Sequence, residues 1–256
     1  MLDRITPIVS TYNEAPNLAR TLDKLAWAKD VVLVDSASTD ETLAIARRYP
    51  NVRIFQTPDP TLAGKWNFAL TGTGIATDWI LALDADYVVT DGLIAELRGL
   101  APPPDLAAYR VNFVYCVHGR PLRSSIYPPD CKLLRRPGLS FVQDGHTQRA
   151  VFAGPVRALQ GHILHDDRKS LSRWLWSQDR YQAAEARKLL ARRVAELDVS
   201  DRIRRQAVFG PFLVFLHILF VKGLIWDGRA GLYYAFQRMA AEIILALNLL
   251  DEELHR

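Results

Sequence analysis

Residues 79–92 read WILALDADYVVTDG, and this stretch decides how the rest of the chain is interpreted. Five consecutive apolar residues, Trp79 to Leu83, lead into two aspartates, Asp84 and Asp86, with one alanine between them. An apolar run without alternation is typical of a strand that is covered on both faces. Because a buried carboxylate is costly unless it is paired or binds a metal, two of them at a strand end indicate a site for a divalent cation.

Short apolar runs alternate with helical patterns from residue 5 to residue 92. We predict strands over 5–10, 31–35, 52–56 and 79–84, and helices after Pro16, from Ser38 and over 63–72. Ser38 and Glu41 have the spacing of a capping box, which predicts that the second helix starts at Ser38. This alternation is typical of an α/β fold, an open and mostly parallel sheet with helices on its faces.

Three polar loops follow the predicted strands: STYNE at 10–14, DSASTD at 35–40 and DAD at 84–86. In open parallel sheets ligands bind beyond the carboxyl ends of the strands, where these loops should meet. Each loop alone could be an ordinary turn. Their joint occurrence favours a binding site, and their oxygen ligands favour Mg²⁺ or Mn²⁺. The chain has neither a Walker-type GKS/GKT motif nor a GxGxxG motif, which argues against P-loop and dinucleotide-binding proteins.

The composition is that of a globular protein, with 256 residues, 49% of them hydrophobic and 23% charged. Cys116 and Cys131 match no metal-ligand spacing and fit a reducing compartment better than a disulfide framework. The N-terminal residues show no basic leader before an apolar stretch, so we expect no signal peptide.

The net charge of +4 is unevenly distributed along the chain. Residues 1–119 carry a net charge of −4, residues 120–205 carry +9, and residues 206–256 carry −1. A basic middle segment could face phosphates, anionic lipid or nucleic acid, and a solvated helix surface is the alternative.

Several stretches resemble a known family. IVSTYNEAPNLARTL, VVLVDSASTDET, GKWNFAL and WILALDADYVV are similar to the N-terminal half of family 2 glycosyltransferases, inverting enzymes with a GT-A (Rossmann-like) fold. This likeness covers residues 5–92. FVQDGHTQRAVFAG, LQGHILHDDRKSL and GLIWDGRAGLYYAF more loosely resemble the subgroup that builds lipopolysaccharide cores.

The resemblance implies roles for particular residues. The nucleotide-sugar donor would be bound by Thr11, Tyr12, Glu14, Asp35, Lys65 and Asp84. Asp35 matches the acidic residue that pairs with the uracil edge in UDP-sugar members. Asp86 matches the aspartate that binds the metal on the diphosphate, and His165 matches a histidine that many GT-A enzymes bring to the metal. A packed histidine after a strand is the alternative for His165.

An inverting transferase also needs a general base that takes the proton of the acceptor hydroxyl. Where relatives carry valine-histidine-glutamate, ungapped matching places His146, Thr147 and Gln148, and a glutamine cannot act as a base. Asp144 is therefore our candidate, with His146 in reserve. Asp166 and Asp167 are weaker candidates because they also suit the start of the following helix.

The C-terminal part is predicted to be helical. We expect a GT-A domain over 1–205, with a nucleotide-sugar half at 1–100 and an acceptor half at 101–205, followed at 206–256 by an apolar helical hairpin that turns near Asp227-Gly228. The apolar run from Ala207 to Val221 has 15 residues, fewer than the ~20 needed to span a bilayer. With its basic neighbour, the hairpin predicts peripheral attachment to the inner face of the cytoplasmic membrane. Packing of the hairpin on the catalytic domain or on a second copy of the chain is the alternative.

The sequence thus predicts a metal-assisted, inverting transfer from a nucleotide-sugar donor, UDP-linked by resemblance, to a glycan or lipid-linked acceptor such as a lipopolysaccharide core. We expect no nucleic-acid partner, and the oligomeric state stays open. Two other classes remain. One is a phosphatase of the haloacid dehalogenase kind, whose DxD normally follows the first strand. The other is a non-catalytic, membrane-associated scaffold with a transferase fold, which Gln148 favours.

Overall fold

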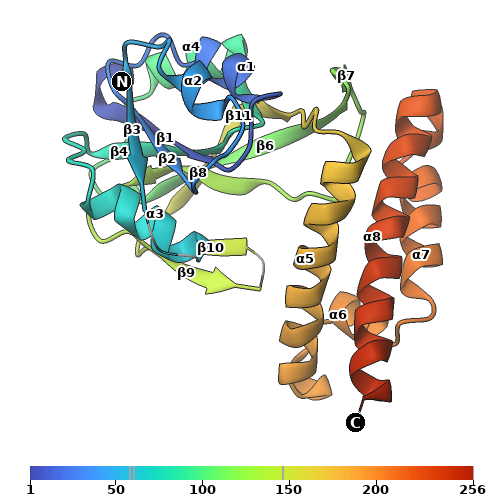
Figure 1. The fold of residues 1–256 in the computed structure, drawn as a ribbon. Coiled ribbons are helices and arrows are strands. Elements are labelled where there is room, and N and C mark those ends of the chain that lie inside the picture. Colours follow the sequence, from blue (N-terminus) through green and yellow to red (C-terminus); the bar gives the residue numbers. More distant parts are fainter. Residues whose placement is uncertain (58, 60, 146, 256) are drawn as a thin grey trace. The chain divides into compact units, whose positions relative to one another are not determined.

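The computed structural model describes residues 1–57, 59, 61–145 and 147–255. Their contacts divide the chain into two compact units (Figure 1). The sheet unit comprises Met1–Gly119, Tyr127–Gln143 and Thr147–Arg168, and the helical unit comprises Arg120–Ile126, Asp144–His146 and Lys169–Arg256. Residues 169–205 therefore group with the C-terminal helices, and the predicted domain boundary at residue 205 stays a prediction.

The strands are β1 (Ile5–Thr11), β2 (Val31–Asp35), β3 (Val52–Gln56), β4 (Trp79–Asp84), β5 (Tyr87–Val89), β6 (Ala108–Val117), β7 (Arg120–Pro121), β8 (Asp130–Arg135), β9 (Ser140–Asp144), β10 (Thr147–Val151) and β11 (Val156–His165). The α-helices are α1 (Leu18–Asp23), α2 (Thr42–Ala46), α3 (Leu62–Thr71), α4 (Asp91–Gly99), α5 (Leu171–Ala191), α6 (Val199–Arg205), α7 (Gly210–Leu216) and α8 (Gly228–Leu254). Short 3₁₀ helices lie at Leu2–Arg4, Val194–Glu196 and Leu224–Asp227, and a π-helical turn lies at His217–Val221.

The sheet unit is built on one large sheet with the strand order β3-β2-β1-β4-β8-β6-β11-β5. β1 is parallel to β2 and β4, β2 is parallel to β3, and β6 is parallel to β11. β8 runs antiparallel to β4 and β6, and β5 runs antiparallel to β11. β9 and β10 form a separate two-stranded sheet. The predicted α/β fold with a mostly parallel sheet is confirmed.

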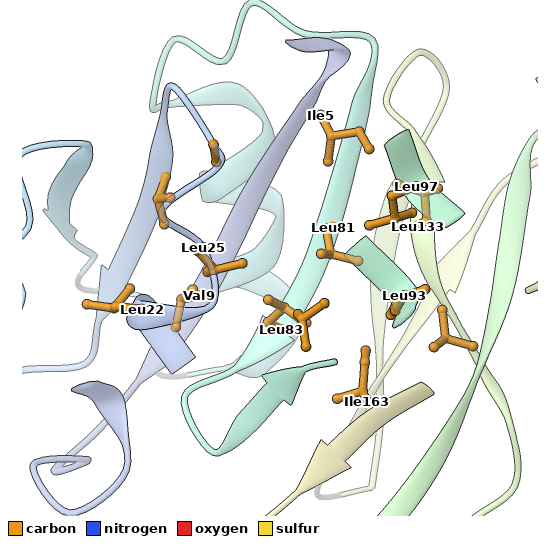
Figure 2. Packing of buried hydrophobic residues seen from close by; sticks show 14 of the residues in the cluster. Ile5, Val9, Leu22, Leu25, Leu81, Leu83, Leu93, Leu97, Leu133 and Ile163 are labelled. Atoms are coloured by element: carbon orange, nitrogen blue, oxygen red, sulfur yellow. The ribbon is translucent and has the colours of Figure 1, made fainter. Parts of the chain in front are cut away.

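Both faces of the sheet are buried, as the continuous apolar runs predicted. On one face, alternate strand residues pack against leucines of α1 and α4 (Figure 2); the labelled members are Ile5, Val9, Leu22, Leu25, Leu81, Leu83, Leu93, Leu97, Leu133 and Ile163. On the other face, the intervening strand residues Ile8, Val34 and Ile80 pack with Trp66 of α3. With both faces covered, ligands can reach this part of the sheet at the strand ends.

A close approach between α4 and β11 fixes the course of β11. A Cβ atom on Gly161 would lie 2.6 Å from the Cα of Leu93, so this position has no room for a side chain. The Gly161 N–H donates to Oε2 of Glu96 at 2.8 Å, and Thr90 Oγ1 donates to the His162 carbonyl at 2.7 Å. These contacts hold the strand that ends in His165.

The predicted start of the second helix at Ser38 is wrong, because α2 begins at Thr42. The Ser38 hydroxyl donates to the carboxylate of Asp35 and accepts from the backbone N–H of Asn13. The Ser38 hydroxyl therefore bonds to other residues and does not cap a helix. Asp40 instead accepts from the backbone N–H of Thr42 at 3.0 Å, within the first turn of the helix.

The helical unit contains the predicted C-terminal hairpin. α8 packs against α5 and α7, and the chain turns between α7 and α8 at residues 222–227. The core between α5 and α8 consists of Ala186, Leu189, Leu197, Leu245 and Leu249. Within the described part of the chain, no single helix has the length and hydropathy to cross a membrane; Gly210–Val221 and Leu224–Leu254 pass that test only together, with a bend of 75° between them.

A buried ion-pair network joins three helices of this unit. Arg204 of α6 lies 3.1 Å from both carboxylate oxygens of Glu242 on α8 and 3.2 Å from Glu185 on α5. The side chains of Glu185 and Glu242 are only 8% and 14% exposed. Burial opposes the charged form of Arg204, but the two glutamates outweigh it and raise the pKa of the guanidinium.

Candidate functional site

Asp35 lies at the end of β2 and is fully buried. Thr11 Oγ1 donates to Oδ1 at 3.0 Å, Ser38 donates through its hydroxyl and its N–H, and Gln56 Nε2 donates to Oδ2 at 3.2 Å. A carboxylate has about four lone-pair sites, so these four bonds fill its capacity. The sequence analysis identified neither Ser38 nor Gln56 as a partner of Asp35, although Gln56 ends β3, the strand beside β2.

The loop after β1 is tied to the loop after β2. Asn13 accepts from the backbone N–H of Thr39 at 2.7 Å, and the Glu14 N–H donates to Thr42 Oγ1 at 2.7 Å. The Glu14 carboxylate accepts from the buried amide of Asn17 at 2.8 Å. Tyr12 is 36% exposed at the tip of this loop. Thr11 therefore ends β1 beside Asp35, and Tyr12 and Glu14 follow it on a loop that is held by these hydrogen bonds.

Lys65 lies in the first turn of α3 and is 93% buried, with 7% of its surface exposed. Burial lowers the pKa of its ammonium, while the nearby carboxylates of Asp84 and Asp35 oppose that shift. Thr61 caps the helix by accepting from the Gly64 N–H at 3.0 Å. The carboxylates at the ends of β2 and β4 thus both act electrostatically on one buried lysine.

Asp84 ends β4 next to β1. In the parallel register Ser10 lies opposite Asp84, and the next residue, Thr11, lies opposite Asp35. Burial raises the pKa of Asp84, and the positive charge of Lys132 opposes this. Because β1 runs between β2 and β4, the three polar loops meet at one edge of the sheet, as the sequence predicted.

Asp86 follows Asp84 in the turn before β5, and the structure brings His165 to it. β5 and β11 pair in an antiparallel register with His165 opposite Tyr87, and the Asp166 N–H donates to the Asp86 carbonyl at 3.1 Å. His165 Nε2 lies 3.3 Å from Asp86 Oδ2. Burial opposes protonation of His165, but the carboxylates of Asp86 and Asp84 outweigh it and raise the pKa of the imidazole.

Three tyrosines surround the His165 ring, and sequence reasoning missed them. The ring centroids of Tyr87, Tyr115 and Tyr127 lie 5.0, 4.7 and 5.5 Å from that of His165, each with its plane steeply inclined to the imidazole. Burial raises the pKa of Tyr87 well above its usual value, and the negative charge of Asp84 adds to the shift. The tyrosines come from three separate stretches of chain, so no local pattern links them.

The donor set fits a divalent metal. Two atoms that share an octahedral ion at 2.1 Å lie about 3 Å apart, close to the 3.3 Å between Asp86 Oδ2 and His165 Nε2. Among the described residues no group of three or more histidine, cysteine, aspartate or glutamate side chains is arranged to hold a metal. Mg²⁺ in proteins usually takes one or two protein carboxylates and completes its shell with substrate phosphates and water.

The candidate bases lie in different environments. Asp144, at the end of β9, belongs to the helical unit, where Lys188 Nζ lies 2.9 Å from its Oδ1. His146 lies outside the described residues. Asp166 is buried and accepts from Arg20, Arg168 and the N–H of Gly119, so it braces the sheet unit. Asp167 accepts from Asn17 at 2.9 Å. The following helix is capped by Ser170 rather than by either aspartate.

Two relatives match nearly the whole length of the chain. An uncharacterized glycosyltransferase of Rickettsia bellii is 24% identical over 253 residues, which cover 92% of this chain and 83% of the relative. The lipopolysaccharide core biosynthesis glycosyltransferase LpsC of Rhizobium meliloti is 26% identical over 243 residues, which cover 89% of this chain and 84% of LpsC.

Among solved structures, S. aureus TarS 1–349 in complex with UDP-GlcNAc is similar, with a TM-score of 0.51 and 14% identity, over 99% of this chain and 92% of that one. At this identity the likeness concerns the fold alone, and it supports the expected GT-A fold. A family model for "Glycosyl transferase family 2" matches residues 6–143, more than half of the chain. The protein therefore belongs to glycosyl transferase family 2.

Proposed function

We propose that the protein transfers a sugar, with inversion, from a UDP-linked donor to a glycan or lipid-linked acceptor such as a lipopolysaccharide core. The observation that carries the proposal is the meeting of Asp35, Lys65, Asp84 and the Asp86–His165 pair at one edge of the sheet. The relative LpsC, named for lipopolysaccharide core biosynthesis, supports the acceptor class. The UDP linkage of the donor follows from the resemblance of Asp35, buried at the end of β2, to the acidic residue that pairs with the uracil edge in family members that use UDP-sugars.

The donor's nucleoside would lie at the loops after β1 and β2. Thr11, Tyr12 and Glu14 would hold the base and ribose, and Asp35 would present its filled carboxylate to the uracil edge. For uracil to bind there, Gln56 or the Ser38 hydroxyl would have to break its hydrogen bond to the Asp35 carboxylate. Lys65 would supply positive charge next to Asp84, on the side where the phosphates begin.

Asp86 and His165 would hold a divalent cation, Mg²⁺ or Mn²⁺, together with the diphosphate. Bound there, the cation supplies charge neutralisation for the leaving nucleoside diphosphate. Asp84 would accept hydrogen bonds from the ribose and the donor sugar. Asp144 would take the proton of the acceptor hydroxyl, a role worth about 10²–10⁴-fold in rate.

A donor screen tests the proposal. Thermal unfolding would be followed with UDP-glucose, UDP-galactose, UDP-GlcNAc and GDP-mannose, each with Mn²⁺ and with EDTA. Since a ligand that binds only the folded state raises apparent stability, we expect stabilisation by at least one UDP-sugar that depends on Mn²⁺. Hydrolysis of p-nitrophenyl phosphate without nucleotide binding would favour the phosphatase. A protein that neither binds a nucleotide-sugar nor hydrolyses p-nitrophenyl phosphate would favour the scaffold.

We also propose that the helical unit attaches the protein peripherally to the inner face of the cytoplasmic membrane. α7 and the turn after it expose large apolar side chains, with Phe212, Phe220 and Trp226 59%, 62% and 77% exposed. No acidic residue occurs from 206 to 226, and Lys222 and Arg229 flank the exposed Trp226. Tryptophan and cations around an apolar surface suit the headgroup region of an anionic leaflet.

Flotation with vesicles of neutral and of anionic phospholipid tests the attachment. We expect the full chain to float with anionic vesicles at low salt. Replacing Phe220 and Trp226 by serine should abolish flotation, whereas Val151→Ser, at an exposed residue of the sheet unit, should not. A protein that stays in solution with both kinds of vesicle would contradict the membrane proposal and favour packing of the hairpin on a second copy of the chain.

A further inference from the structure

Two parallel tyrosine rings lie beside the Asp86–His165 pair. The centroids of Tyr115 and Tyr127 are 5.6 Å apart with an angle of 1° between the planes, an offset-stacked arrangement. Tyr115 is the inner ring at 8% exposure, and Tyr127 is the outer ring at 39%. The His165 imidazole contacts both rings at 61°. Tyr127 is thus an exposed aromatic surface supported by a second ring and by the imidazole.

The strand order relates this surface to the proposed course of the donor. Asp35 ends β2 on one side of Asp84, whereas His165 ends β11 on the other side, beyond β8 and β6. A nucleotide-sugar runs from base through ribose and diphosphate to the sugar. With the base near Asp35 and the diphosphate near Asp84 and Asp86, the next group along the molecule comes to the side of His165 and its tyrosines.

We propose that Tyr127, supported by Tyr115, stacks against the pyranose ring of the donor sugar and thereby contributes to donor specificity. This inference rests on the proposed function. One face of a pyranose carries C–H bonds and is apolar, and an aromatic face carries the negative side of its quadrupole, so the two surfaces are complementary. Binding sites commonly combine such aromatic walls with a few polar groups that fix orientation, as Asp84 and Asp86 would here.

Matched substitutions at Tyr127 separate stacking from simple filling of space. Tyr127→Phe keeps the ring, whereas Tyr127→Leu keeps an apolar side chain but removes the aromatic face. Dissociation constants would be measured by calorimetry with Mn²⁺ for UDP and for UDP-glucose, UDP-galactose and UDP-GlcNAc. The ratio of the UDP constant to the UDP-sugar constant reports the sugar contact alone.

We expect Tyr127→Leu to weaken the best-bound UDP-sugar about three- to tenfold and to leave UDP binding unchanged. Tyr127→Phe should stay within about twofold of the wild type for both ligands. An unchanged ratio in Tyr127→Leu, or an equal loss of UDP and UDP-sugar binding, would overturn the inference. Wild-type protein that binds no UDP at all would overturn the proposed donor as well, so the two failures are distinguishable.

Discussion

Asp35 and Asp86 show two ways in which this fold places a carboxylate at a strand end. Asp35 is satisfied by donors of the protein itself, from Thr11, Ser38 and Gln56. Asp86 instead lies beside His165, an imidazole whose pKa its charge raises. The first arrangement keeps the carboxylate oxygens at fixed positions. The second places two potential metal ligands 3.3 Å apart, close to the separation of two atoms that share an ion.

At the scale of single residues we first predict the effect of Asp86→Asn. The amide is nearly isosteric, so the fold should persist, but the charge that would attract the cation is lost. We expect the Mn²⁺-dependent stabilisation by UDP to disappear, as judged by thermal unfolding with and without EDTA. Asp91→Asn, at a carboxylate that is 83% exposed and pairs with Lys24, is the matched control and should respond as the wild type does. Undiminished Mn²⁺ dependence in Asp86→Asn would exclude the metal role.

The second residue-scale prediction concerns the base. Asp144→Asn should lower turnover, measured as UDP release, by about 10²-fold or more while donor affinity stays nearly unchanged, because the group acts on the acceptor proton. Lys188→Met removes the partner 2.9 Å away and serves as the control for a purely structural role. If both variants lost turnover equally, the Asp144–Lys188 ion pair would have a structural role and the catalytic base would be another residue.

Some site residues could be placed from the sequence alone, and others could not. Asp84 and Asp86 follow an apolar run that is typical of a buried strand, and Asp35 ends another such run. The meeting of the three aspartates at one edge of the sheet was therefore predictable. Tyr87 and Tyr115 meet His165 because β5 and β6 pair with β11 on either side, and Tyr127 reaches it from the segment between β7 and β8. That order depends on pairing between distant segments, which local periodicity does not contain.

At the scale of elements, local hydrogen bonding explains where helix prediction failed. Strands β2 and β3 have the predicted bounds, because apolar runs bounded by polar residues leave little choice. The start of α2 was misplaced by four residues, since Ser38 is bound to Asp35 rather than to a helix end. A capping-box spacing cannot reveal that its serine is needed elsewhere.

Gly161→Ala is the prediction for the elements α4 and β11. Its Cβ would meet the backbone of Leu93, which cannot move without shifting α4. We expect a loss of about 1–3 kcal/mol in the free energy of unfolding, measured by urea denaturation. Gly99→Ala, at the last residue of α4 and with nothing within 4 Å of the new Cβ, should be neutral or stabilising by up to about 1 kcal/mol. Equal stabilities of the two variants would show that α4 can shift to make room for the new Cβ at little cost in free energy.

At the scale of the whole molecule, the chain combines a sheet unit with an interior of apolar residues and a helical unit that encloses charges. The sheet unit follows the family pattern, and its class was predictable from strand alternation. The ion-pair network of the helical unit was not, because Glu185, Arg204 and Glu242 are far apart in sequence and each resembles an ordinary surface residue of a helix.

Arg204→Met tests that network. It leaves Glu185 and Glu242 buried without their shared cation, and breaking such a pair costs about 3–5 kcal/mol. We expect a clearly lower unfolding midpoint by circular dichroism, where α5 and α8 supply much of the helical signal. Arg193→Met, at an exposed pair with Glu196, should unfold close to the wild type. A wild-type midpoint for Arg204→Met would mean that the glutamates are solvated or paired in another way.

The pairing of β5 with β11 has a consequence for how the chain tolerates changes in length. β5 has only three residues, yet its pairing with β11 sets His165 opposite Tyr87, and the pairing of β11 with β6 sets it opposite Tyr115. Side chains alternate along a strand, so a slip by one residue would turn the imidazole to the opposite face of the sheet and away from Asp86. A deletion within 161–165 should therefore remove the histidine from the site even if the protein folds. Insertions before Gly161 should be absorbed by the irregular pairing between Ala158 and His162.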